Sequence, residues 1–196
     1  SSVLRPVQST DPASDLPAFT TGQVLRYGSV RPLLVANAVL YTGVAMQAAA
    51  LGKQAYDITG RSADLGWIGL AEFLPAIMLV LVTGTVADRF NRKRVALFAI
   101  SGEALTSIAL LLYAWSDPTE VWPLFIIAFL YGIARAFLAP ATRTMPPMVA
   151  PEGGLPKVIA LYSATWTGAI IVGPAMSGFL YAIDPWVVYL ASSMLI

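Results

Sequence analysis

The chain has 196 residues, of which 57% are hydrophobic and only 12% are charged. Soluble domains carry about 25% charged residues, so half that share indicates a multi-pass membrane protein. The net charge of +1 gives no sign of nucleic-acid binding, and the sequence contains neither His nor Cys. Disulfides, Cys–His nucleophiles and metal sites of thiolate or imidazole are therefore excluded, no cofactor is expected, and any proton chemistry falls to carboxylates.

The N-terminal segment differs from the rest of the chain. Residues 1–25 are rich in Ser, Thr, Pro, Asp and Gln and lack the ordered features of a signal peptide. We predict a flexible cytoplasmic tail here, and a transmembrane bundle over residues 26–196. Because the chain starts at Ser1 and ends at Ile196 inside an apolar run, we expect it to be part of a longer protein.

The bundle contains five segments that are long and apolar enough to cross a bilayer. A spanning helix needs roughly 20 mostly apolar residues, and the segments that qualify are 32–55, 65–87, 95–115, 122–142 and 158–182. A sixth apolar segment begins at Pro185 and reaches Ile196, which is too short to span. The sequence therefore predicts an all-α membrane protein with a truncated sixth helix.

Basic residues alternate from one connection to the next. On one side of the membrane the connections hold Arg61 as their one basic residue, with Lys53 at the membrane boundary. The other side holds eight basic residues: Arg26, Arg31, Arg89, Arg92, Lys93, Arg94, Arg143 and Lys157. The Lys/Arg-rich side faces the cytoplasm, so the N-terminus is predicted to be cytoplasmic in a bacterial-type plasma (inner) membrane. Interfacial tryptophans support this orientation, since they cluster at the predicted outer boundary: Trp67, Trp115, Trp122 and Trp186.

Three ionisable residues fall within the predicted spans, where charge is costly and usually functional. Glu103 and Arg135 lie at similar depth on consecutive helices, so they could form an ion pair. Glu72 lies nearer the outer end, level with Gln47 and far from Arg135 in depth. One interpretation makes Glu72 or Glu103 the carrier of a coupling proton. The other makes Glu103–Arg135 a structural pair and Glu72 a neutral, hydrogen-bonded core group.

Glycine and proline are concentrated in the segment 158–182. Gly168, Gly173, Pro174 and Gly178 could form a hinge or sealing contact of a moving helix, or serve ordinary close packing. The segment 65–87 carries a comparable set, and both are second helices of three-helix units that run in opposite directions. This correspondence indicates the inverted repeat common in transporters.

The connection between the second and third spans carries the most specific pattern. Its residues Gly84-Thr85-Val86-Ala87-Asp88-Arg89-Phe90-Asn91-Arg92-Lys93 resemble motif A of the major facilitator superfamily, with Asn91 where that motif has Gly. Gly173 to Gly178 resembles the end of the antiporter motif C, although Ser177 replaces a Gly. Arg135 resembles the arginine of motif B, without its following Gln and Gly. Residues 135–149 are similar to the enterobactin-exporter-like, drug-efflux branch.

The resemblance implies twelve helices in two six-helix halves, with this chain as the N-terminal half built from a 3+3 inverted repeat. In the family, motif A is a conformational latch. Asp88 would then face a helix N-terminus of the other half, Arg89, Arg92 and Lys93 would pair with acids or anionic lipids, and Gly84 would permit close approach. The preference of basic residues for the cytoplasmic side of a membrane accounts for Arg89, Arg92 and Lys93 without a latch, but it does not account for the acidic Asp88.

The function expected from these features is secondary active export of small amphipathic molecules, of drug or siderophore type, by alternating access. Coupling to protons is expected because no ATP-binding loop is present. Helices one, two, four and five would line the site, with Gln47 and Arg135 as contacts of a small-molecule substrate; lipids and the C-terminal half would be partners. The alternative is a half-length or degenerate relative that is a structural subunit of a membrane complex. No acid–base constellation suggests an enzyme.

Overall fold

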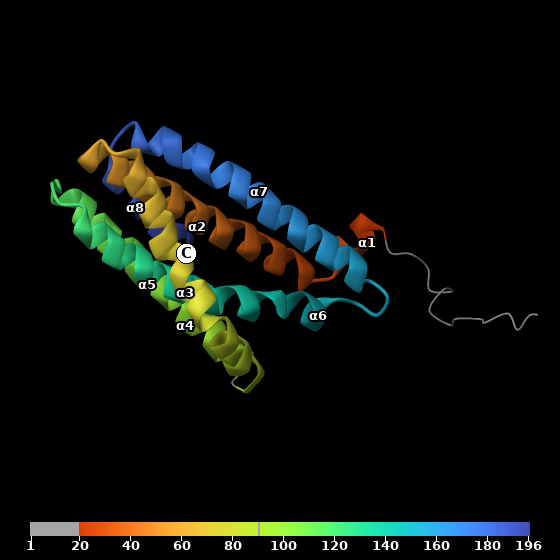
Figure 1. Cartoon of the computed structure of the whole chain (residues 1–196). Coiled ribbons are helices and arrows are strands. Elements are labelled where there is room, and N and C mark those ends of the chain that lie inside the picture. The colour runs from red at the N-terminus through yellow and green to blue at the C-terminus, as the bar shows by residue number, and fades with distance from the viewer. Residues whose placement is uncertain (1–19, 90) are drawn as a thin grey trace, which may run out of the picture.

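In the computed structural model, residues 20–89 and 91–196 are described, without the side chains of residues 80–81, 84–89 and 92. Every regular element in this part of the chain is a helix (Figure 1). The helices are α1 (Thr21–Arg26), α2 (Val30–Thr59), α3 (Ser62–Arg89), α4 (Arg92–Trp115), α5 (Trp122–Arg143), α6 (Met145–Val149), α7 (Leu155–Tyr181) and α8 (Pro185–Leu195). The predicted all-α class is confirmed.

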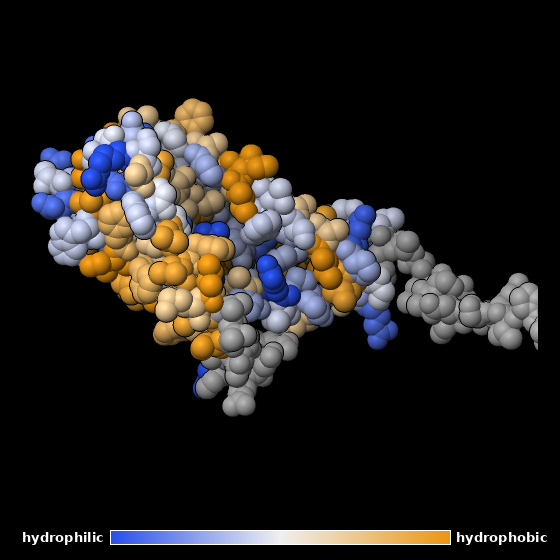
Figure 2. All heavy atoms as spheres, viewed as in Figure 1, coloured by the Kyte–Doolittle hydropathy of each residue, from blue (hydrophilic) through white to orange (hydrophobic). Residues whose placement is uncertain are grey.

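The five long helices α2, α3, α4, α5 and α7 fall on the five segments that hydropathy predicts to span the membrane. The eleven-residue α8 is apolar but shorter than a span. Large apolar side chains are exposed along the bundle; Phe98, Leu105 and Leu112 of α4 follow each other at seven-residue intervals and are 67–70% exposed. A stripe with that spacing suits contact with lipid, and Figure 2 shows apolar surface spread over the long helices.

Local signals account for the ends of several helices. Gly60 ends α2 in the left-handed conformation (φ 66°), and its N–H donates to the Tyr56 carbonyl, as expected where glycine follows a helix. Asn91 caps α4, because its side chain accepts a hydrogen bond from the Lys93 backbone N–H at 3.0 Å. The residue that departs from motif A is therefore a good N-cap type in the place where a helix begins.

The flexible tail predicted over residues 1–25 does not extend to residue 25. Residues 1–19 lie outside the described part, but residues 21–25 belong to α1, which Thr20 and Gln23 stabilise with a reciprocal capping box. Val24 of α1 is fully buried in a small apolar cluster with Val30 and Val158. The capping pair and the burial of Val24 favour a helix over a flexible chain here, so the tail prediction is wrong for these residues.

The helices pack in two equivalent sets. α2 packs along α7 and α8, while α5 packs along α3 and α4, and Figure 1 shows α2 and α7 side by side. Exchanging the first unit (α2, α3, α4) with the second (α5, α7, α8) converts α2–α7 into α5–α3 and α2–α8 into α5–α4. This is the arrangement that a 3+3 inverted repeat requires.

Each of these four interfaces contains a glycine whose Cβ would collide or nearly collide with the partner helix. Gly43 faces α8, Gly102 faces Ala134 of α5, Gly132 faces the α3 backbone and Gly173 faces α2. A methyl group added at any of the four would have its nearest neighbouring atom only 2.2–3.0 Å away. Small residues thus set the helix spacing throughout the bundle, as is common in membranes.

Candidate functional site

A cavity of about 800 Å³ opens between α2, α3, α5 and α7. These are the four helices that the sequence analysis expects around a substrate site. The polar and charged residues that line the cavity come from all four helices: Tyr41, Glu72, Thr83, Arg135, Thr142, Arg143, Tyr162 and Ser163. Phe73 and Trp166 add large aromatic surfaces, so the wall combines apolar area with a few polar groups, as in many small-molecule sites.

Glu72 and Arg135 meet in this cavity because α3 and α5 approach closely at Gly132. A Cβ on Gly132 would lie 2.2 Å from the Glu72 carbonyl oxygen, which leaves room only for glycine. Arg135 is one turn further along α5, within electrostatic reach of Glu72. The prediction that Glu72 lies far from Arg135 in depth is therefore wrong, because α3 and α5 run in the same direction with these two residues almost level.

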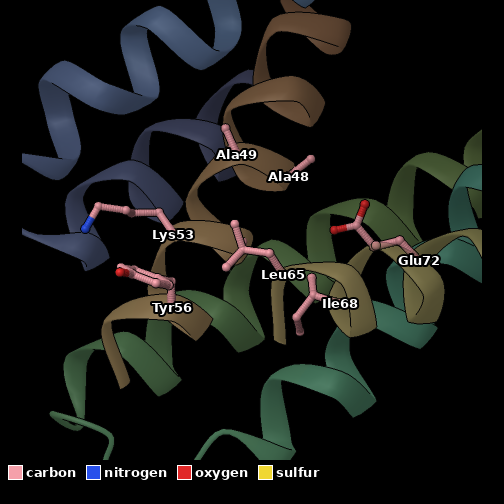
Figure 3. Close-up of a pocket in the computed structure, with 9 residues that line it drawn as sticks. Ala48, Ala49, Lys53, Tyr56, Leu65, Ile68 and Glu72 are labelled. Carbon is pink, nitrogen blue, oxygen red and sulfur yellow. The ribbon is translucent and has the colours of Figure 1, made fainter. Parts of the chain in front are cut away.

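A second, smaller cavity of about 450 Å³ lies between α2 and α3. Figure 3 shows Lys53 and Tyr56 at one end of this pocket and Glu72 at the other, with Leu65 and Ile68 between them. Glu72 thus lines both cavities. Of the described ionisable residues that line the four-helix cavity, Glu72 is the one that also lines the pocket between α2 and α3.

Glu103 occupies a different environment. Its side chain is fully buried and lines neither cavity, and neither carboxylate oxygen has a hydrogen-bond partner among the described residues. The ion pair predicted between Glu103 and Arg135 is not formed in this part of the chain. Arg135 is within electrostatic reach of Glu103, but the two side chains do not meet, because Glu103 of α4 is fully buried and Arg135 is exposed on the cavity wall.

Gln47 is also buried. Its Nε2 donates to Thr106 Oγ1 at 3.3 Å, its Oε1 has no partner among the described residues, and it lines neither cavity. The structure places this substrate candidate in the interior between α2 and α4, so the expected position on a cavity wall is wrong. Arg135, the other substrate candidate, does lie on the wall.

A cluster of hydroxyl groups at the Arg143 end of the cavity was not predicted. The Tyr41 hydroxyl and Thr142 Oγ1 are 2.9 Å apart, and the Tyr162 hydroxyl donates to the Thr142 carbonyl at 3.4 Å. One turn before Tyr41, Asn37 Nδ2 donates to Thr165 Oγ1 at 2.7 Å. The available signal was the pair of polar residues Asn37 and Tyr41, four apart on one face of an apolar helix.

The motif A residues lie mainly outside the described side chains: Gly84, Asp88, Arg89 and Arg92. Lys93 is described and is exposed in the first turn of α4. The latch assignment for these five residues therefore stays a prediction.

The glycines and proline of α7 separate into two groups. A Cβ on Gly173 would lie 2.6 Å from Ala45 Cβ and 3.0 Å from the Thr42 carbonyl oxygen, so Gly173 packs α7 tightly on α2. Pro174 and Gly178 are exposed, and a Cβ on Gly178 would meet nothing within 4 Å. The helix runs through Pro174 without interruption, and a hinge at this point stays a prediction.

Comparison with known proteins places these features in a family. A family model described as the Major Facilitator Superfamily matches residues 33–196. The chain is 29% identical over 125 residues to macrolide efflux protein A of Streptococcus pyogenes, covering 64% of this chain and 31% of that protein. It is 31% identical over 131 residues to the multidrug efflux pump Tap of Mycobacterium tuberculosis, covering 63% of this chain and 30% of that protein.

A further relative is the uncharacterized MFS-type transporter YfiS of Bacillus subtilis, 28% identical over 134 residues, with 68% of this chain and 31% of that protein covered. The chain thus spans about a third of the length of these curated relatives. No solved structure gives a significant match.

Proposed function

Because the chain belongs to the major facilitator superfamily, we propose that it is the N-terminal six-helix half of a proton-coupled exporter of small amphipathic molecules. The observation that carries this proposal is the four-helix cavity, which holds Glu72 and Arg135 within two apolar helices. Its volume of about 800 Å³ lies in the usual range for small-molecule sites. The efflux relatives support export as the direction of transport.

The proposed coupling depends on the neighbouring charges. While Glu72 is ionised, its carboxylate attracts the Arg135 guanidinium, and both charges are held in a wall of low dielectric. Binding of a proton to Glu72 removes that attraction and leaves Arg135 available to a substrate. The binding of a proton and the binding of a substrate would then be thermodynamically linked through one shared cation.

The latch and the orientation form part of the same proposal. Gly84, Asp88, Arg89, Arg92 and Lys93 would lock the half against a C-terminal half in one state of the cycle. The N-terminus would be cytoplasmic in the plasma membrane, with lipids and the C-terminal half as partners. Lys and Arg predominate at that end of the bundle, as the orientation requires.

Transport by the intact natural protein in everted membrane vesicles tests the proposal. We expect accumulation of a neutral amphipathic dye such as N-phenyl-1-naphthylamine when the lumen is acidified, and loss of accumulation when an ionophore collapses the proton gradient. A native product near 20.9 kDa that no partner completes, together with no dye movement, would contradict the transporter and favour a structural subunit.

A further inference from the structure

The charges on the cavity wall are unbalanced. Among the described residues that line it, Glu72 is the one acid, whereas Arg135 and Arg143 are both cationic. Within the described part of the chain, neither arginine forms an ion pair. Even with Glu72 ionised and attracted to Arg135, one guanidinium has no opposite charge among the described residues that line this wall.

The end of the cavity beside Arg143 is also rich in hydrogen-bonding groups. Arg143 is the last residue of α5, and Thr142 precedes it in the cluster with the Tyr41 and Tyr162 hydroxyls. Ser163 of α7 lies on the same wall. Arg135 is eight residues before Arg143, about 12 Å along the helix, so an extended molecule could contact both.

Aromatic side chains line the same cavity as the arginines and hydroxyl groups. Phe73 of α3 and Trp166 of α7 line the same cavity, and their side chains are 62% and 43% exposed. These exposed rings offer apolar area to a bound molecule. The cavity thus combines guanidinium and hydroxyl groups with aromatic surface, which is complementary to a molecule that has an acidic group and an apolar body.

We propose that the cavity takes amphipathic organic anions, whose carboxylate, sulfonate or phosphate group binds Arg143 and Arg135 while the apolar body lies against Phe73 and Trp166. This rests on the proposed function and names its substrate class. Arginine suits the role because its planar fork donates two parallel hydrogen bonds to such groups. A permanently cationic amphiphile would instead meet like charge at the Arg143 end.

Two dyes that share one scaffold test the proposal in everted vesicles that contain the intact protein. N-phenyl-1-naphthylamine is neutral, and 1-anilinonaphthalene-8-sulfonate is the same molecule with an added sulfonate. We expect the wild-type protein to accumulate the sulfonated dye at least as fast as the neutral dye. Arg143→Gln should lower the transport rate of the sulfonated dye at sub-saturating concentration about tenfold, which corresponds to the loss of a charge-assisted hydrogen bond. It should lower the transport rate of the neutral dye less than threefold. Arg143→Lys, which keeps the charge but lacks the planar fork, should restore only part of the loss.

Lys157→Gln is the matched control, since it removes one cation from the same side of the bundle but away from the cavity. It should leave the ratio of the two rates unchanged. Transport of the neutral dye without the sulfonated dye, or an equal loss of both in Arg143→Gln, would overturn the anion proposal while leaving export intact. Movement of neither dye by the wild-type protein would overturn the proposed function itself.

Discussion

The two carboxylates buried in this bundle, Glu72 and Glu103, lie in opposite kinds of surroundings. Both have Arg135 within electrostatic reach, but only Glu72 of the two lines the cavities. Glu103 is fully enclosed, and no described group donates a hydrogen bond to either of its carboxylate oxygens. Glu72 is thus a candidate to exchange a proton with the cavity, whereas Glu103 is part of the closed interior of the bundle.

The difference teaches that depth along a helix is a weaker guide to function than the face on which a residue lies. α3 contributes to the cavity wall, whereas no described side chain of α4 lines it. Only a carboxyl that a proton can reach from an aqueous cavity can serve in coupling. We therefore favour Glu72 over Glu103 as the proton carrier, and three experiments can break or sharpen that contrast.

The largest effect is expected from Glu72→Gln. The amide keeps the size of the side chain but cannot exchange a proton, so accumulation driven by a proton gradient should fall at least tenfold in everted vesicles, a barrier change of about 1.4 kcal/mol or more. Glu103→Gln, the matched variant, should lower it less than threefold. A larger loss in Glu103→Gln than in Glu72→Gln would reverse the assignment.

Gly132→Ala should have the next largest effect, because the added methyl group would lie 2.2 Å from the backbone of Glu72. Separating α3 from α5 should lower the free energy of unfolding by about 1–3 kcal/mol, typical of overpacking, and reduce transport with it. Thermal unfolding of the purified protein is the measurement. Gly66→Ala on α3, where a Cβ meets nothing within 4 Å, is the control and should leave stability unchanged or raise it by up to about 1 kcal/mol, because alanine favours a helix over glycine.

The smallest effect is expected from Glu103→Met. This change replaces a buried carboxyl that has no described partner with an apolar side chain of similar length, so the free energy of unfolding should rise by about 1 kcal/mol. The same thermal unfolding assay measures it, with transport followed in parallel. A stability loss of similar size would show that Glu103 makes a favourable interaction in the intact protein.

Much of the fold followed from the sequence, because long apolar runs leave few alternatives to spanning helices. The five long helices and the four cavity helices fell where hydropathy and the family resemblance placed them. The surroundings of individual side chains could not be predicted from the sequence. Depth along a span can be estimated from a fixed rise per residue, but the estimate for Glu72 relative to Arg135 was wrong. The rotation of each helix could not be estimated, and rotation decided that Gln47 and Glu103 are interior and Arg135 is on the wall.

The α1 helix is a second place where the structure differs from the prediction. Polar composition favoured a tail over residues 21–25, whereas the Thr20–Gln23 capping box and the single apolar anchor Val24 outweighed it. The hydroxyl cluster at Tyr41, Thr142 and Tyr162 is a third. Its members are far apart in sequence and come from three helices, so only the packing brings them together.

The glycines at the helix interfaces also bear on how selectivity could be engineered. Gly43, Gly102 and Gly173 fix helix spacing at positions that are not on the cavity wall. A larger residue at one of them would move a whole helix by a fraction of its diameter and leave every lining side chain unaltered. The width of the cavity can therefore be changed by substitutions outside its wall, independently of the side chains that line it.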